Sequence, residues 1–302
     1  LGIAIPPFET PMQEPVPFAG LFSKTDARTP WVFLGICDDT QSSFLHGPAD
    51  APECIRRAYD GRCYNATTES GVDLASSVKD LGDLKPRSTW EASAREYRAR
   101  VEEIVREGET PFIAGGDHAI TVPVVEAFAV LRRPIHVIQI DAHPDLYPEF
   151  EGNPDSHAST AARLLEMDHV QSLTQIGIRT MNEEQRRHAE RWSSRLHVLE
   201  ARRLEGALPA LAHIPAEAAV YMTVDMDGFD PAFAPGVSHP VPGGLTARQV
   251  IGLILRGHWT LVGMDAVEVN PARDIQYMTA ILAGRLLHEG MGYAARGRAA
   301  AR

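Results

Sequence analysis

Histidine and acidic residues are concentrated in four short segments of the chain. The segments are GGDHAI (115–120), DAHPDLY (141–147), DMDGFDP (225–231) and EVNP (268–271). In the second segment Asp141, His143 and Asp145 occupy alternate positions, and Asp225 and Asp227 repeat this spacing. Alternation in an extended chain places side chains on one face. Carboxylates gathered in this way repel one another unless a positive charge lies between them, so the pattern predicts a metal site.

The donor types indicate which metal the site would take. The carboxylates of Asp141, Asp145, Asp225 and Asp227 and two imidazoles, without any thiolate, suit Mn²⁺ or another borderline-to-hard divalent ion better than structural zinc. Four carboxylate charges also balance two divalent ions. We therefore expect two divalent metal ions.

Apolar and amphipathic stretches alternate along the chain and predict the elements that position these segments. Strands are expected at 31–37, 80–84, 111–116, 135–141, 173–178, 196–199, 220–227 and 261–269, and helices at 51–59, 90–108, 118–132, 159–167, 182–192, 204–212, 246–257 and 275–289. This order predicts a single α/β domain of three layers, with a mostly parallel central sheet and helices on both faces. Ligands bind beyond the carboxyl ends of the strands in such sheets, and the four polar segments lie there.

The ends of the chain differ in composition from its centre. Residues 1–30 are rich in proline and predict an irregular N-terminal arm, which could lie on a neighbouring subunit. The catalytic domain is expected to span 31–290. Residues 291–302, rich in Ala, Arg and Gly, predict a frayed C-terminal tail.

Composition excludes several classes of function. The formal net charge of −11 disfavours a nucleic-acid binder and is compatible with a cationic ligand. Cys37, Cys54 and Cys63 are an odd number without CxxC spacing, which argues against a disulfide framework and indicates a reducing, cytoplasmic compartment. The chain has no apolar run approaching about 18 residues and no signal-peptide pattern at its start, so no membrane association is expected.

The four polar segments resemble, in order and spacing, the signature blocks of the ureohydrolase (arginase/agmatinase) family. Additional segments resemble the plant-arginase branch in particular, which lies close to agmatinases. They are SSFLHGPADAPECIRRA (42–58), YNATTESGVDL (64–74), HPDLYPEFEGNPDSHAS (143–159), QIGIRTMN (175–182) and DPAFAPGVSH (230–239). The resemblance implies an arginase/deacetylase-like fold and hydrolysis of a guanidino compound to urea and an amine.

The resemblance also implies roles for individual residues. His118 and Asp145 would hold one metal, His143 and Asp227 the other, and Asp141 and Asp225 would bridge the two. Asp117 and Asp230 match acids that orient such ligands. Mn²⁺ is the metal that we expect first, with Ni²⁺ as the alternative.

The remaining assignments concern substrate and proton transfer. His157 matches the family's mobile catalytic histidine, a proton shuttle, and Glu268 matches the carboxylate that pairs with the guanidinium. Asp145 would carry a proton to the leaving amine. Asn153 and Ser159 are candidate contacts to the substrate's α-carboxylate or amine.

The sequence leaves the substrate and two alternatives open. The plant-like resemblance nominates arginine or agmatine, whereas Pro154-Asp155 and Pro240-Val241-Pro242 depart from that branch and keep a free or alkylated guanidine, a biguanide or a guanidino acid open. A single-zinc deacetylase shares the fold. The family implies a homotrimer or homohexamer, and an active subunit in a mixed oligomer with a non-catalytic paralogue is a further possibility.

Overall fold

Eight parallel strands form one sheet in a computed structural model that describes residues 17–23, 29–62 and 64–300. The strand order is β2-β1-β3-β8-β7-β4-β5-β6, and every pair is parallel. The strands are β1 (Trp31–Ile36), β2 (Val78–Leu84), β3 (Thr110–Ala114), β4 (Ile135–Ile140), β5 (Val170–Ile178), β6 (Leu196–Glu200), β7 (Ala219–Asp225) and β8 (Thr260–Val267). The parallel α/β fold predicted from the sequence is confirmed.

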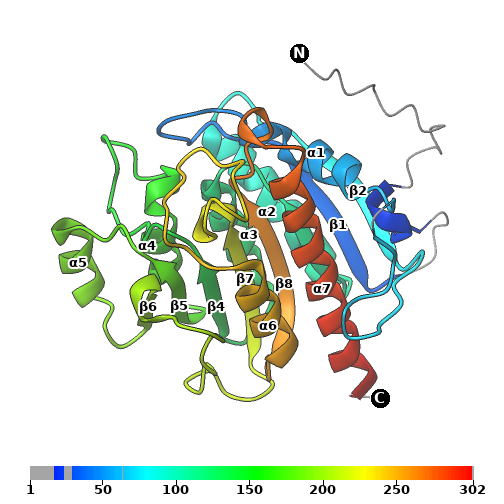
Figure 1. The fold of residues 1–302 in the computed structure, drawn as a ribbon. Helices are drawn as coiled ribbons and strands as arrows, with labels where there is room; N and C mark the ends of the chain where they lie inside the picture. The colour runs from blue at the N-terminus through cyan, green and yellow to red at the C-terminus, as the bar shows by residue number, and fades with distance from the viewer. Residues whose placement is uncertain (1–16, 24–28, 63, 301–302) are drawn as a thin grey trace, which may run out of the picture.

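Helices cover both faces of this sheet, which makes three layers (Figure 1). One face is covered by α1 (Ala51–Ala58), α6 (Ala247–Arg256) and α7 (Met278–Ala300). The other is covered by α2 (Trp90–Arg106), α3 (Thr121–Ala127) and α4 (Thr160–Glu166), with α5 (Glu183–Glu190) near the β6 edge. Successive residues of a strand enter opposite cores: Met222 packs toward α6 and α7, and Tyr221 packs toward α3. Burial of both faces explains why β4 reads as a continuous apolar run.

Local signals fix where two of the helices begin. The Thr89 side chain accepts a hydrogen bond from the Ala92 amide and caps α2. Thr246 and Gln249 form a reciprocal capping box at the start of α6. Each arrangement satisfies amide groups that have no partner within the helix.

Two predicted helices differ from the structure. The helix expected at 204–212 is wrong: that segment is irregular, because Gly206 takes a left-handed φ of 67° and Pro209 has no amide hydrogen to donate. Leu208 and Leu211 are nevertheless buried in the α6 core. The helix expected at 118–132 is divided into a 3-10 turn at His118–Ile120, then α3, then a second 3-10 turn at Phe128–Leu131.

The two ends of the chain also require correction. The frayed tail expected at 291–302 is wrong as far as Ala300, because α7 continues to that residue and buries Met291 and Ala294. Much of the predicted N-terminal arm, residues 1–16 and 24–28, lies outside the described residues. Within the arm, Phe18 and Leu21 are fully buried in this chain's own core. Among the helices that the structure describes, none has the length and apolar character that crossing a bilayer requires.

Candidate metal centre

The predicted ligands meet at the carboxyl ends of the four central strands, β3, β8, β7 and β4. His118 follows β3, Glu268 follows β8, Asp225 and Asp227 end and follow β7, and Asp141, His143 and Asp145 follow β4. Because these strands are adjacent and parallel, their ends meet at one edge of the sheet. The structure therefore brings all six predicted metal ligands together.

The ligand atoms form two groups that share Asp141. His118 Nδ1 lies 3.1 Å from Asp145 Oδ2, 3.2 Å from Asp141 Oδ2 and 3.3 Å from Asp225 Oδ2. His143 Nδ1 lies 2.9 Å from Asp227 Oδ2 and 3.8 Å from Asp141 Oδ1. In each group, His118–Asp141–Asp145 and Asp141–His143–Asp227, the ligand atoms lie within 4.8 Å of one another. Two neighbouring groups that share one carboxylate could each hold a metal ion.

The chemistry of the donors fits two divalent cations. His118 Nδ1 is buried and has no hydrogen-bond partner among the described residues, although three carboxylates face it. Burial and the charges of Asp145 and Asp227 raise the pKa of Asp141 to about 7. Burial, with the charges of Asp227 and Asp141, raises the pKa of Asp225 well above its ordinary value. Bound cations would supply the charge that holds these acids ionised.

The same carboxylates act on the second histidine. Burial would lower the pKa of His143, but the charge of Asp227 and its hydrogen bond raise it to about 10. In return His143 outweighs burial and lowers the pKa of Asp227. Each member of the pair therefore favours the charged form of the other.

Strained backbone aims two of the functional side chains. Asp145 has φ of 48° and Glu268 has φ of 63°, a left-handed conformation uncommon for residues other than glycine. Close contact also requires glycine beneath the site, since a Cβ at Gly116 would lie 1.8 Å from the Asp38 carbonyl oxygen. The Glu268 amide donates to the Gly116 carbonyl (2.8 Å), which joins the β3 and β8 tips.

A carboxylate with one unpartnered oxygen lies beside the ligands. Glu268 Oε1 accepts the His118 amide (2.9 Å) and lies 2.8 Å from His157 Nδ1. Glu268 Oε2 is buried and has no partner among the described residues. Burial would lower the pKa of His157, but the charge of Glu268 and their hydrogen bond raise it to about 9. His157 Nε2 lies 2.8 Å from Ser43 Oγ, so both ring nitrogens are engaged.

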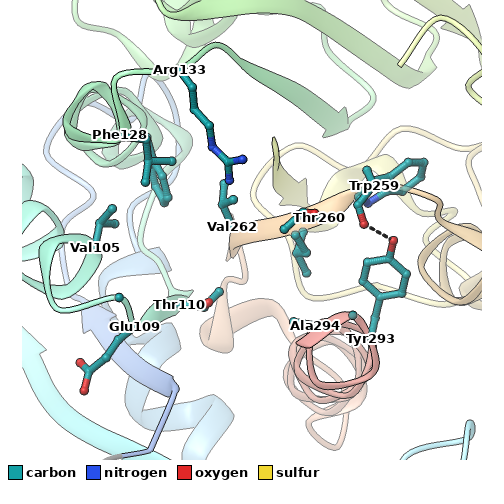
Figure 2. A pocket seen from close by; sticks show the side chains of 14 residues that line it. Val105, Glu109, Thr110, Phe128, Arg133, Trp259, Thr260, Val262, Tyr293 and Ala294 are labelled. Carbon is teal, nitrogen blue, oxygen red and sulfur yellow. Dashed lines mark hydrogen bonds between the residues drawn. The ribbon is translucent and has the colours of Figure 1, made fainter. Parts of the chain in front are cut away.

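These groups open onto a cavity of about 230 Å³. Its lining residues are Ser43, His118, His143, Asp145, Tyr147, Phe150, His157, Ala158, Thr180, Gln185, Asp225, Asp227, His239 and Glu268. A hollow of about 290 Å³ lies at the opposite ends of β3 and β8, where Arg133 extends over Val262 and Tyr293 bonds the Trp259 carbonyl (Figure 2). None of the predicted site residues lines that hollow, so the smaller cavity holds the chemistry.

A model of the Arginase family matches residues 29–292. The chain belongs to the Arginase family. It is 38% identical over 277 residues to a protein named arginase 1, mitochondrial, of Arabidopsis thaliana, covering 87% of this chain and 80% of that protein. It is 33% identical to N(1)-aminopropylagmatine ureohydrolase of Thermus thermophilus over 86% of this chain and 89% of that one.

Solved structures of the family have the same fold. Agmatine ureohydrolase of Thermoplasma volcanium superposes with a TM-score of 0.79 at 30% identity, covering 90% of this chain and 92% of that chain. The comparisons confirm the resemblance seen in the sequence, and with it membership of a family of hydrolases that act on guanidino C–N bonds. The His and Asp cluster is a set of residues that could hold metal ions.

The structure separates the other predicted site residues. Asp117 is buried and accepts the Gln41 and Ala119 amides at 2.9 and 3.0 Å, whereas Asp230 caps the turn at Gly243 (2.7 Å). Neither Asn153 nor Ser159 is among the residues that line the cavity. The Asn153 amide donates to Gln41 Oε1 (2.8 Å), and Ser159 is fully buried. The geometry therefore lends these two residues no support as substrate contacts.

Sequence reasoning missed the hydrogen-bonding groups on the Nε2 side of the His118 ring. His118 Nε2 lies 3.0 Å from Thr223 Oγ1, which lies 3.4 Å from Thr121 Oγ1. Thr121 and Tyr221 donate to Asp265 Oδ2 on the strand next to Thr223, at 2.9 and 2.7 Å. This chain of bonds places the proton on Nε2 and leaves Nδ1 for a metal. A buried Thr and Asp inside otherwise apolar strands were the available signal.

His239 was missed as well. It lines the cavity, with its ring centroid 5.3 Å from that of His157 and 5.9 Å from that of His143. Burial lowers the pKa of His239, which favours a neutral imidazole. In the sequence this residue stands in a loop without strand or helix periodicity, so only its histidine side chain could have attracted notice.

Proposed function

We propose that the chain hydrolyses a guanidino compound to urea and an amine with two divalent metal ions. The observation that carries this proposal is the pair of ligand groups sharing Asp141, beside Glu268, whose Oε2 has no partner in the part of the chain that the structure describes. A guanidinium is planar and presents N–H donors in a fork that a carboxylate accepts. Glu268 supplies that acceptor inside the cavity.

The reaction adds water across a C–N bond. The bond between the guanidinium carbon and the substituted nitrogen breaks, the carbon gains the oxygen of water and becomes urea, and both protons of water end on the leaving nitrogen, which departs as an ammonium ion. When bound, the two ions supply a water molecule activated for attack and positive charge for the transition state. Glu268 orients the guanidinium carbon toward them. Asp145 accepts a proton at its carboxylate and delivers it to the leaving nitrogen.

His157 connects this proton transfer with the cavity mouth. Its Nδ1 contacts Glu268 Oε1, and its Nε2 contacts Ser43 at the cavity wall. Its raised pKa of about 9 favours the positively charged imidazolium form near neutral pH. We therefore assign His157 to proton exchange between the site and solvent.

Mn²⁺ is the metal that we propose first and Ni²⁺ second, since carboxylate and imidazole donors without thiolate suit borderline-to-hard ions. A single-zinc deacetylase would need only one ligand group. The second group around His143 favours two ions over that alternative. A homo-oligomer, or a mixed oligomer with a paralogue, stays a prediction that light scattering of the purified chain would test.

The test is urea release by the purified chain after metal removal and reloading with Mn²⁺ or Ni²⁺. The panel contains arginine, agmatine, guanidinobutyrate, guanidine, dimethylguanidine and a biguanide, and bound metal is counted by elemental analysis. Two ions per chain and urea from at least one compound are expected. Asp141→Asn should remove both the metal pair and the activity, with Asp155→Asn, outside the ligand groups, as control. Two bound ions without urea from any compound would overturn the guanidino assignment.

A further inference from the structure

The two nitrogens of the His157 ring contact different parts of the site. Nδ1 lies 2.8 Å from Oε1 of Glu268, which is buried and also accepts the His118 amide. Nε2 lies 2.8 Å from Ser43 Oγ and accepts the Ser43 amide hydrogen, with 3.1 Å between the nitrogens. Among the residues that the structure describes, no other group hydrogen-bonds to either ring nitrogen. Ser43 is therefore the partner of the nitrogen that points away from Glu268.

Ser43 presents two kinds of hydrogen-bonding group to the same nitrogen. Its backbone amide donates, so the amide bonds a neutral ring whose Nδ1 carries the proton and whose Nε2 accepts. Its hydroxyl can accept, so the hydroxyl is the partner for the Nε2–H group of an imidazolium, after a small rotation of the ring. Both protonation states of His157 thus find a partner on one residue, as a group that passes protons requires.

The Ser43 hydroxyl lies between a buried ring and bulk water. The side chain of His157 is only 10% exposed, whereas Ser43 is exposed and also lines the cavity. A substrate bound through Glu268 would occupy the cavity and displace water from that side of the ring. The exposed hydroxyl of Ser43 then gives Nε2 a contact with solvent that does not pass through the cavity floor.

The loop that carries Ser43 is fixed relative to the site by two sets of hydrogen bonds. Asp117 Oδ2 accepts the Gln41 amide (2.9 Å) and the Ser42 hydroxyl (3.3 Å). The Gln41 carbonyl accepts the His157 amide (3.3 Å), which joins the loop to the segment that carries the histidine. These bonds hold Ser43 against the ring, so its position is set by the fold.

The charged groups around His157 favour a ring that carries a proton. Burial lowers the pKa of His157, and the charges of Glu268, Asp117 and Asp145 raise it, to about 9 in total. His239 has its ring centroid 5.3 Å from that of His157, and burial lowers the pKa of His239, which favours its neutral form. The acids therefore stabilise an imidazolium whose Nε2–H group needs an acceptor.

We infer that Ser43 relays protons between His157 and bulk water, an inference that rests on the proposed function. On the outward path the Nε2 proton passes to Ser43 Oγ while the hydroxyl gives its own proton to a water molecule or a buffer base. The ring becomes neutral and the serine keeps one proton. The inward path reverses both transfers. One transfer in each direction leaves no net proton per turnover, as hydrolysis to urea and an ammonium ion requires. Ser43 acts through His157 and is a positioning residue.

Ser43→Ala separates the two contacts, because alanine keeps the amide and removes the hydroxyl. On metal-loaded protein, with both ions counted by elemental analysis, it should lower kcat by about 10- to 100-fold in dilute buffer and leave KM nearly unchanged. Higher concentrations of HEPES at constant ionic strength should restore kcat, since the buffer base replaces the missing proton acceptor. Ser43→Thr keeps the hydroxyl and is the matched control, which should resemble the unchanged protein. A full kcat in Ser43→Ala, or a loss that HEPES does not restore, would overturn the inference and leave the proposed function standing.

A second measurement does not depend on activity. The hydroxyl accepts a hydrogen bond from the charged ring, so Ser43→Ala should lower the pKa of His157. Histidine NMR of the metal-free protein would follow this pKa, with the resonance assigned through His157→Asn. An equal pKa in Ser43→Ala and the unchanged protein would overturn the inference. Absence of urea from every compound would overturn the proposed function, and the pKa comparison would still decide whether Ser43 serves the imidazolium.

Discussion

Thr223→Val tests how the protein prepares His118 for a metal. Valine has nearly the shape of threonine, so the change removes one buried hydroxyl with little change of volume. That hydroxyl lies 3.0 Å from His118 Nε2 and 3.4 Å from Thr121 Oγ1, which donates to Asp265 on the next strand. Without it the Nε2–H group has lost its acceptor in a fully buried strand, and the imidazole is free to take the other tautomer.

The size of the effect follows from the burial of this hydrogen bond. Leaving one buried donor unsatisfied costs about 1–3 kcal/mol. Converted to affinity, this is a loss of about 5- to 150-fold, which overlaps the 10- to 100-fold typical of groups that orient a ligand. The loss should fall on the ion held by His118, whereas the ion held by His143 and Asp227 should retain its affinity.

The assay is a titration of metal-free protein with Mn²⁺ against a chromophoric chelator, which resolves two binding steps. Tyr221→Phe is the matched control, because the Tyr221 hydroxyl donates to Asp265 Oδ2 (2.7 Å) and is not a partner of His118 or Thr223 among the described residues. Circular dichroism melting would confirm that both variants are folded. Two unchanged binding steps in Thr223→Val, or an equal loss in Tyr221→Phe, would refute the reasoning.

Other predictions concern substrate binding, acid stability and loop structure. Glu268→Gln should lower kcat/KM, with a loss of about 2–5 kcal/mol in transition-state stabilisation, while both metals stay bound. Kinetics and elemental analysis would measure the two effects. Burial lowers the pKa of His288 to about 4, so its folded form binds fewer protons than the unfolded chain. The contribution of His288 to the free energy of unfolding should therefore be constant above about pH 6.5 and should fall as the pH drops toward 4. His288→Gln should make the free energy of unfolding, measured in denaturant titrations, depend less steeply on pH in this range. Arg179→Lys should destabilise the fold by at least about 2 kcal/mol in the same titrations, because an ammonium replaces only part of a fork that serves five carbonyls.

Much of the metal centre could be predicted from the sequence because its residues are local to strand ends. Asp141, His143 and Asp145 follow an apolar strand directly, so alternation alone predicts that they act together. The same holds for Asp225 and Asp227. The sequence predicts the wrong structure for 204–212 and for 291–300. Gly206 and Pro209 make the first segment irregular, and burial of Met291 and Ala294 extends a helix through the second, so these effects outweigh composition.

The sequence by itself determined the strand and helix alternation and the donor types, which predict divalent metal ions, and its resemblance to the ureohydrolase family indicated the class of reaction. Tertiary structure alone decided the strand order β3-β8-β7-β4, in which the last strand of the chain lies between two earlier ones. That order brings Glu268 beside His118, 150 residues away, and sets Asp265 behind Thr223. It arises from packing apolar faces of non-sequential strands against both helical layers, a long-range energy that no local spacing contains. The left-handed backbone at Asp145 and Glu268 was also decided by the tertiary structure, because only the surrounding structure makes such strain tolerable.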